Sequence, residues 1–580
     1  MRWVQSVLCR RVGIVVVQIV CRKISHTYIN FYYQTANNLG EQKPPENIMN
    51  TFLTKSINIP LGKTDNYIDY IAACCRLTPD AIHNLRLYKQ SVDARDKDNI
   101  HFVCSFLFDS NKAMIRNAQI YVAPHDILAE LPVKHPVLHK TVVVVGAGPA
   151  GLFAALYLAK VGFKVIIIEK GLDIAHRTKI VKKYFAGGEF NPSCNVQFGL
   201  GGAGAFSDGK LTTGISTPYN YTVFRQFVRA GAPENILYSA LPHIGTDKLG
   251  VCVGSLRDEI MHHGGEFWYN SYLDWLFLDS DNNVRAVKVI GGEKKYNQIE
   301  CDAVVLATGH SARDVFELLD FQGANLAFKP FAVGLRIEHT RQFIDNAQYG
   351  LAATHRDLSA ASYKLVHNGE KHGVYSFCMC PGGIVVAANS EPDTVVVNGM
   401  SNYARDAANS NSAIVVTVNA DNIYKFGYGN GIFAGIDFQR DLERRAFALG
   451  GGNYVAPCQS VADFVANRTS TADSLQPFPS YPRGVKPSNL RNLLPNELND
   501  SIVEALAVFD RKLKGFGTSG VLTGVETRTS SPIRILRDES YQSNLRNLYP
   551  TGEGAGYAGG IVSSAVDGLR IATAIFDRFK

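Results

Sequence analysis

An apolar stretch that runs directly into a glycine turn constrains the fold of this chain most strongly. Residues 141–151 read TVVVVGAGPAG, which gives Gly146, Gly148 and Gly151 the spacing GxGxxG before a helical pattern. In such a turn Gly146 permits the sharp bend, Gly148 lets the backbone approach a pyrophosphate, and Gly151 lets the helix pack on the strand. The N-terminus of that helix faces the phosphates. The pattern therefore predicts a dinucleotide-binding turn.

The residues after this turn complete a strand–helix–strand unit. LFAALYLAKVG at 152–162 supplies the helix, and FKVIII at 163–168 supplies the second strand. Glu169 follows that strand directly, where an acid can hold the hydroxyls of an adenosine ribose. A glycine-rich loop without a binding role is the alternative, and the complete unit argues against it.

Composition indicates a globular protein of two to four domains. The chain has 580 residues, of which 46% are hydrophobic and 19% charged. Its net charge is +7, but residues 1–48 hold six Lys or Arg and two Glu, which leaves only +3 for the remainder. A clustered basic face is not indicated, which argues against nucleic-acid binding. The 11 cysteines form no regular framework, which favours a reducing compartment.

Residues 1–48 differ from the rest of the chain. Five basic residues precede the first acid, Glu41, and flank an apolar stretch at 12–20 that is too short to span a membrane. One interpretation is an organelle transit segment, which would place the protein in a mitochondrial or plastid matrix. The other is that translation begins at Met49, which would leave a cytoplasmic protein. We expect no integral membrane segment, and the sequence does not set the oligomeric state.

The rest of the chain divides into four segments. The strand-like stretch at 302–309, DAVVLATG, continues the nucleotide domain after a long insertion, and residues 548–578 again read as strand, glycine turn and helix. We therefore expect the chain to return to that domain at its end. The predicted segments are a small α+β domain at 49–135, the nucleotide domain at 136–329, an α+β cap at 330–525, and the return segment at 526–580.

Several long motifs resemble one family. VVVVGAGPAG, CNVQFGLGGAGAFSDGKLTTG at 194–214, SFCMCPGG at 376–383, GVETRTSSPIRI at 524–535 and YPTGEGAGYAGGIVSSAVDG at 549–568 are similar to the FAD-dependent dehydrogenases with a dedicated C-terminal domain. The resemblance runs from Met49 to Lys580. It departs at Cys194 and Leu200, where the family often has Ser and Glu. The resemblance implies an α/β fold with a Rossmann-like, two-dinucleotide-binding-type FAD domain, an inserted α+β cap and a small N-terminal α+β domain.

The resemblance also implies which residues hold FAD. The glycine turn would face the pyrophosphate, and the acid after the second strand would meet the adenosine end. The late glycine–acid pair would contact the ribityl or phosphate portion, and the last glycines would begin a helix under the flavin. The expected cofactor-binding residues are Gly146, Gly148, Pro149, Ala150, Gly151, Glu169, Lys170, Ala307, Thr308, Gly309, Gly552, Glu553, Gly560 and Ile561.

Candidates for chemistry beside the flavin are fewer. Cys378 and Cys380 could relay electrons through a thiolate, although ordinary loop cysteines are the favoured interpretation and a disulfide across one residue would be strained. Lys210, beside Asp208, could place a cation near the flavin or an acidic substrate. No metal site is expected, since a second well-spaced pair of ligands is missing.

Arginines and one histidine raise a choice between substrate binding and structure. Arg528 could clamp a carboxylate, or it could pair within GVETRTSSPIRI with Glu526, a choice that also applies to Arg534. Arg336 with Glu338 in GLRIEH raises the same choice, and structural ion pairs are favoured for each. His310 could donate to the flavin or the substrate, but a hydrogen-bonded turn histidine is more usual.

These observations favour an FAD-dependent oxidoreductase that transfers hydride to or from a small organic substrate. NAD(P)H would act as a transient reductant, because the sequence shows no second strand-linked GxGxxG. A flavoprotein that binds or modifies RNA is one alternative, with 49–130 as its RNA module. A protein that binds FAD without catalysis is another.

Overall fold

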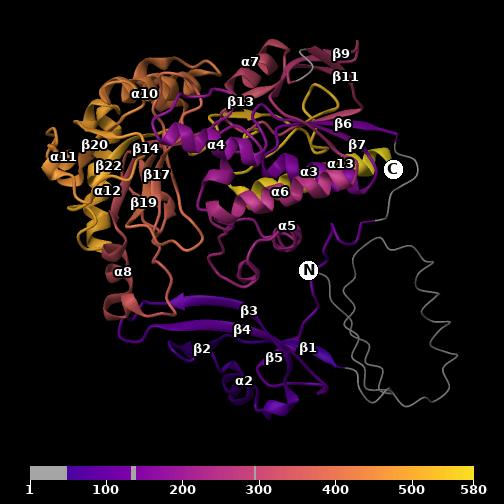
Figure 1. Cartoon of the computed structure of the whole chain (residues 1–580), viewed down its shortest axis with the longest axis vertical. Helices are drawn as coiled ribbons and strands as arrows, with labels where there is room; N and C mark the ends of the chain where they lie inside the picture. The colour runs from indigo at the N-terminus through magenta and orange to yellow at the C-terminus, as the bar shows by residue number, and fades with distance from the viewer. Residues whose placement is uncertain (1–48, 132–138, 293–295) are drawn as a thin grey trace, which may run out of the picture.

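The computed structural model describes residues 49–131, 139–292 and 296–580 (Figure 1). The predicted N-terminal extension at 1–48 lies outside the described residues. No helix among those residues is long and apolar enough to cross a membrane.

The first unit is a five-stranded antiparallel sheet with one long helix. Its strands run in the order β2-β4-β1-β5, and β3 pairs with the other face of the path at β4. Side chains along β4 alternate between buried and half-buried positions, so Phe102, Phe106 and Phe108 point into one core. Figure 1 shows this unit set apart from the larger body. Its elements are β1 Asn50–Thr54, β2 Ile57–Pro60, α2 Tyr67–Cys75, β3 His83–Asp93, β4 His101–Ser110 and β5 Ala118–Ile120.

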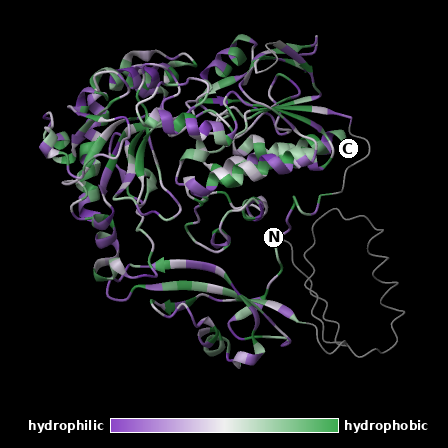
Figure 2. Cartoon of the chain, in the orientation of Figure 1, coloured by the Kyte–Doolittle hydropathy of each residue, from purple (hydrophilic) through white to green (hydrophobic). Residues whose placement is uncertain are grey.

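The second unit is a parallel sheet in the order β24-β12-β6-β7-β8. The five strands are β6 Thr141–Val145, β7 Lys164–Ile168, β8 Glu266–Trp268, β12 Ala303–Leu306 and β24 Leu548–Pro550. Val142 to Val144 are fully buried because both faces of the sheet are covered, and Figure 2 shows these strands as hydrophobic. The sequence prediction of strand, glycine turn and helix at both 141–160 and 548–579 is confirmed.

Different layers cover the two faces of this sheet. Helices α3 Pro149–Lys160, α6 Thr246–His262 and α13 Ile561–Phe579 pack together on one face. Gly568 allows α13 to approach α3, since a Cβ there would lie 2.1 Å from the carbonyl oxygen of Ala150. An antiparallel sheet of β9 Ser271–Leu278, β10 Val284–Gly291 and β11 Tyr296–Glu300 packs on the other face. The predicted hairpin around 280–283 joins β9 to β10.

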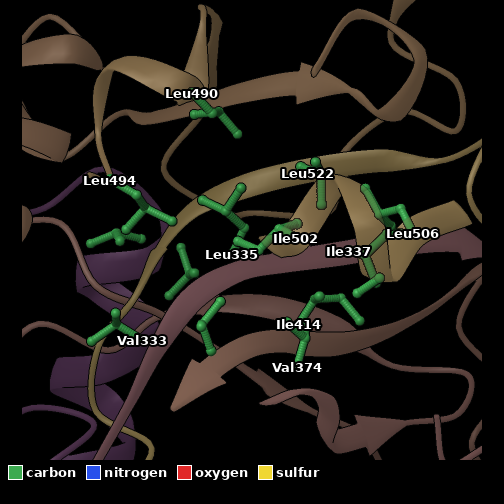
Figure 3. Close-up of a cluster of buried hydrophobic side chains, with 14 of the residues drawn as sticks. Val333, Leu335, Ile337, Val374, Ile414, Leu490, Leu494, Ile502, Leu506 and Leu522 are labelled. Atoms are coloured by element: carbon green, nitrogen blue, oxygen red, sulfur yellow. The ribbon is translucent and has the colours of Figure 1, made fainter. Parts of the chain in front are cut away.

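The third unit is a seven-stranded sheet in the order β15-β16-β19-β14-β22-β20-β21. All neighbours are antiparallel except β20 and β21. Val333, Leu335 and Ile337 of β14 point toward Ile502 and Leu506 of helix α12 (Figure 3). The elements are β14 Phe331–Thr340, β15 Val366–Asn368, β16 Gly373–Cys380, β19 Asn409–Val418, α10 Ala434–Leu449, β20 Ala456–Ser460, β21 Val485–Pro487, α12 Asn496–Lys512 and β22 Val521–Glu526.

Shorter elements connect these units. The hairpin of β17 Ile384–Ala387 and β18 Val397–Met400 lies against β19 and β22, and β13 Leu326–Phe328 pairs with β23 Ile533–Ile535. The remaining α-helices are α4 Ile174–Phe185, α5 Tyr219–Arg229, α7 Arg313–Phe321, α8 Arg341–Tyr349, α9 Ala420–Ile423 and α11 Val461–Val465. The architecture is the expected α/β fold with an additional α+β layer, while the domain boundaries themselves stay a prediction.

Candidate functional site

A cavity of about 380 Å³ opens between the parallel sheet and the seven-stranded sheet. One wall is formed where β6, β7 and β12 end, by Gly146, Glu169 and Ala307. The opposite wall is formed by Cys378 of β16 and Asn398 of β18, together with residues of β22. Ligands of open α/β sheets bind at the carboxyl ends of the strands, and the volume is typical of a small-molecule site.

The first glycine turn is shaped by close backbone contacts. Gly146 has φ +101°, and a Cβ there would lie 2.4 Å from the carbonyl oxygen of Ala307. At Gly151 a Cβ would lie 2.0 Å from the carbonyl oxygen of Gly146, so this glycine permits the packing of α3 on β6. Gly148 differs, because its Cβ would meet nothing closer than the Cα of Gly202 at 3.9 Å and the residue faces the cavity. The turn thus leaves backbone exposed to a ligand.

Two helix N-termini open onto the same cavity. Helix α3 begins after Gly148 and α13 begins after Gly560, and neither cap residue is a side chain that accepts a bond from the first turn. Around Gly559 the cavity is open, with no atom within 4 Å of where a Cβ would stand. Free N–H groups and the positive end of the helix dipole attract anions. The cavity therefore fits a long ligand with negative charge at two places.

Glu169 is held in place by backbone donors. Its Oε1 accepts hydrogen bonds from the backbone N–H groups of Gly171 and Gly199, each at 2.8 Å, and its Oε2 accepts one from Ala147 at 2.9 Å. The neighbouring Lys170 lies 3.0 Å from Oδ2 of Asp314. Glu169 also lines the cavity. This carboxylate both fixes the turn and presents itself to a ligand.

A second acid, Glu553, faces the cavity beside a histidine. The Nε2 atom of His310 lies 3.7 Å from Oε1 of Glu553, while Nδ1 of His310 has no hydrogen-bond partner within the described structure. Burial raises the pKa of Glu553 to about 7. Burial, followed by the nearby Arg528 and Arg313, lowers the pKa of His310 to about 3. At neutral pH the histidine is neutral and the carboxyl group exchanges a proton readily.

Lys210 enters the cavity from the glycine-rich loop after α4. Its Nζ lies 3.3 Å from Oδ2 of Asp208, which is completely buried and which also accepts hydrogen bonds from Arg405. Although burial opposes its charge, Cys380, Cys378 and Asp208 raise the pKa of Lys210. Lys210 is therefore a fixed cation at the cavity wall.

Arg336 reaches this wall from β14. Its Nη1 lies 2.9 Å from Oε2 of Glu526, and both side chains are buried. The predicted pairing of Arg336 with Glu338 is wrong: Glu338 instead accepts hydrogen bonds from Ser480 and Asn409. Burial raises the pKa of Glu526 to about 7 even though Arg336 opposes the rise.

Arg528 lines the cavity but is fully engaged. Its Nε and Nη2 donate to the two carboxylate oxygens of Glu443 on α10, at 2.7 and 2.9 Å, and its Nη1 donates to Ser311 at 2.9 Å. Arg313 also contacts Glu443, at 3.1 Å. The expected pairing of Arg528 within its own motif is wrong, and the fork needed to clamp a substrate carboxylate is already occupied. Arg534 likewise lies over the ring of Tyr557.

The structure brings most of the predicted site residues together. The cavity is lined by Gly146, Gly148, Pro149, Ala150, Glu169, Lys170, Lys210, Ala307, Thr308, Gly309, Cys378, Arg528, Gly552, Glu553, Gly560 and Ile561. Gly151 and Cys380 lie behind this lining. Sequence reasoning missed Gln197, Asn398 and Thr529, which also line the cavity and stand in no motif that marks them. Among the described residues, no group of three His, Cys, Asp or Glu side chains is arranged to hold a metal ion.

Family models match most of the chain. Residues 330–529 match the FAD-dependent protein C-terminal domain-like family, and residues 140–346 match pyridine nucleotide-disulphide oxidoreductase. Residues 55–108 match a domain of unknown function. The parallel sheet, the glycine turn and these matches define an FAD-binding flavoprotein of the oxidoreductase class with a Rossmann-type fold.

A relative places the chain more closely. An uncharacterised protein of Clostridium beijerinckii is 42% identical over 534 residues, which cover 90% of this chain and 98% of that protein. The chain belongs to the family of FAD-dependent proteins that carry this C-terminal domain.

Solved structures resemble the chain only distantly. A flavin-dependent brominase is 14% identical, with a TM-score of 0.34, over 76% of this chain and 79% of its own. A quinol fumarate reductase of E. coli is also 14% identical, with a TM-score of 0.33, over 76% and 70%.

Proposed function

We propose that this FAD-dependent oxidoreductase binds FAD along the cavity and oxidises or reduces a small organic substrate at the wall formed by the seven-stranded sheet. The glycine turn at 146–151 binds the pyrophosphate, and Glu169 with Lys170 meets the adenosine end. The flavin half lies toward Gly552, Glu553 and the start of α13. When bound, FAD supplies the hydride transfer.

One observation carries this proposal: the start of α3 and the start of α13 open onto one cavity. The first is suited to the pyrophosphate and the second to the negative charge of a reduced flavin. Gly148, Gly559 and Gly560 line that cavity with little in the way of their backbones. The polar side chains opposite come from other sheets, which supports a substrate position beside the cofactor.

The side chains of the cavity have distinct tasks in this proposal. Glu553 holds or accepts the proton that accompanies hydride transfer, because its pKa of about 7 makes both forms available near neutral pH. His310 stays neutral and keeps Glu553 in place. Lys210 offers a fixed positive charge to an acidic substrate or to the flavin. The buried pair of Arg336 and Glu526 shapes the wall without moving a net charge.

NAD(P)H is the reductant that we propose, bound transiently. The matched pyridine nucleotide-disulphide oxidoreductase model supports it. Gly450, Gly451 and Gly452 follow α10 and lead into β20, so they do not form a second strand-to-helix glycine turn. A nicotinamide would then have to approach the flavin from the substrate side.

The test uses the full chain, purified with its natural cofactor. We expect an oxidised flavin spectrum with a band near roughly 450 nm, and rapid anaerobic bleaching on mixing with NADH or NADPH. Bleaching would justify a screen of electron acceptors. A protein without flavin would contradict the proposed binding site, and a bound flavin that neither nucleotide reduces would contradict NAD(P)H as the reductant.

A further inference from the structure

Cys378 and Cys380 lie on a β-bulge at the cavity wall. The pairing of β16 with β19 shifts register between Phe377 and Cys380, so β16 holds one extra residue there. Cys378 has φ +46°, a left-handed conformation that is uncommon for residues other than glycine. Such strain persists where the surroundings impose it, and it gathers at functional sites. The bulge is thus a reason to ask what the two thiols do.

The bulge brings the two sulfur atoms together. In a regular strand the Cα atoms of residues two apart are separated by about 6.6 Å, at the upper end of the range that a disulfide spans. The extra residue and the left-handed turn bend the strand at this point. As a result the thiol of Cys380 is hydrogen-bonded to the sulfur of Cys378. The pair is already close before any bond forms.

Two cations from separate elements converge on this pair. Nζ of Lys210 lies 3.9 Å from Sγ of Cys380, and Nη2 of Arg336 lies 3.6 Å from the same atom and 2.8 Å from the carbonyl oxygen of Cys378. The hydrogen bond from Cys380, followed by these cations, lowers the pKa of Cys378 in spite of its burial. The same contact and burial raise the pKa of Cys380. One negative charge is therefore shared by two sulfur atoms and favoured on Cys378.

Exposure gives the two thiols different tasks. Cys378 is half-buried and lines the cavity, whereas Cys380 is completely buried behind it. A thiolate that a ligand can reach, backed by a thiol that it cannot, has the arrangement of an attacking and a resolving cysteine. A thiolate that only adds to carbon would need no second thiol.

Other buried cysteines show the opposite behaviour. Burial raises the pKa of Cys252 to about 11 and that of Cys301 and Cys458 to about 12. Their thiols stay protonated at neutral pH and are inert as nucleophiles. The environment of Cys378 therefore differs in kind from that of an ordinary core cysteine of this protein.

We propose that Cys378 and Cys380 form a dithiol–disulfide pair, a second two-electron centre of the FAD cavity that takes a small disulfide as its substrate. This inference rests on the proposed function, because it requires FAD in the same cavity. It replaces the interpretation of both residues as ordinary loop cysteines.

The reaction balances in two half-reactions. The Cys378 thiolate attacks one sulfur of the substrate disulfide and releases the first thiolate, which takes the proton of Cys380. Cys380 then attacks Sγ of Cys378, which forms the intramolecular disulfide and releases the second thiolate. Two electrons and one proton from the reduced, anionic cofactor return the pair to one thiolate and one thiol. NAD(P)H supplies those electrons in turn.

The experiment counts electrons in the full-length holoprotein. The protein is treated with hydroxyethyl disulfide, desalted, and titrated anaerobically with dithionite while flavin absorbance is followed. We expect the wild type to take up four electrons per FAD, two for the flavin and two for the disulfide. Cys378→Ser and Cys380→Ser should each take up two. Cys74→Ser, which removes a thiol far from the cavity in helix α2, should still take up four.

A second readout locates the bond without relying on variants. Alkylation of the oxidised wild type, followed by mass spectrometry, should show both cysteines of the β16 peptide protected and released together by reduction. A wild type that binds FAD and takes up only two electrons overturns the pair and leaves the proposed function standing. Uptake of four electrons by Cys378→Ser also overturns it. A protein that binds no FAD instead defeats the proposed function, and the inference with it.

Discussion

The guanidinium of Arg528 lies flat against the carboxylate of Glu443, with nitrogen–oxygen distances of 2.7 and 2.9 Å, and both side chains are buried. Arg528 lines the cavity, while Glu443 stands on α10 beneath it. Arg313 contacts the same carboxylate from α7. One acid thus neutralises two buried cations and ties together elements from both walls of the site.

Replacing that acid should destabilise the fold. Glu443→Gln leaves two buried guanidinium groups without their counter-charge, so the free energy of unfolding should fall by about 3–5 kcal/mol. Urea unfolding at pH 7 measures it. Glu504→Gln is the matched control, since Glu504 is an exposed helical Glu that pairs with His367, and it should change stability by about 1 kcal/mol or less. An equal loss in both variants would contradict the role of Glu443.

The same acid predicts how stability depends on acidity. Although burial opposes it, Arg313 and Arg528 bring the pKa of Glu443 down to about 2 from an ordinary value of 4.5. Because the folded value is the lower one, the stabilisation is complete above about pH 4.5 and is lost as pH falls toward 2. The difference in stability between wild type and Glu443→Gln should therefore shrink across that window. A constant difference from pH 7 to pH 3 would argue against an ionised Glu443.

Glu553 should show the opposite dependence. Its folded pKa, raised by burial to about 7, lies above the ordinary value of 4.5, so the folded protein holds the extra proton. Stability should decline as pH rises from about 4.5 to 7 and then level off. Glu553→Gln should flatten this part of the profile when melting of the FAD-free protein is followed between pH 4 and roughly 8. An unchanged slope would show that Glu553 ionises normally.

The glycine turn predicts a clear loss of cofactor. Gly148→Asp would place a carboxylate where the turn faces the cavity, and repulsion of the pyrophosphate should lower FAD content more than about tenfold. The ratio of flavin to protein absorbance measures it. Gly214→Asp is the control, because Gly214 is exposed with open space around its Cα. A yellow Gly148→Asp protein would place the pyrophosphate elsewhere.

The core of the seven-stranded sheet predicts a stability change. Leu506 of α12 is fully buried among the side chains of β14, so Leu506→Ala should cost about 2–5 kcal/mol. Thermal or urea unfolding measures the change. Leu351→Ala, at a fully exposed leucine, should change stability by about 0.5 kcal/mol or less. Similar losses at the two positions would mean that α12 does not cover this sheet as described.

The sequence predicts local features of this molecule well. The turn at 146–151 depends on a strand, three glycines and a helix that are neighbours in the chain, and each of them carries its own residue pattern. The return of residues 548–579 was predictable for the same reason. The bulge at Cys378 was not, because register depends on the partner strand β19.

Pairings across the fold lay beyond the sequence. Arg336 and Glu338 stand two apart on β14, which suggested a pair, but Gly334 lies opposite Glu526 of β22 in the folded sheet and the arginine reaches that strand instead. Arg528 finds Glu443 some 85 residues away for a similar reason. Which charges meet is decided by the order of strands and by helix packing, and neither has a local signal.

The edge position of β24 bears on how the protein is made. This strand adds to a sheet whose other members are synthesised far earlier, and α13 then packs on α3, the first helix of the glycine turn. During translation, the cavity lacks one of its two helix N-termini until Ile561 has left the ribosome. Loading of the cofactor is thus tied to the arrival of the last helix, and a nascent chain that stalls before it would be unable to retain flavin.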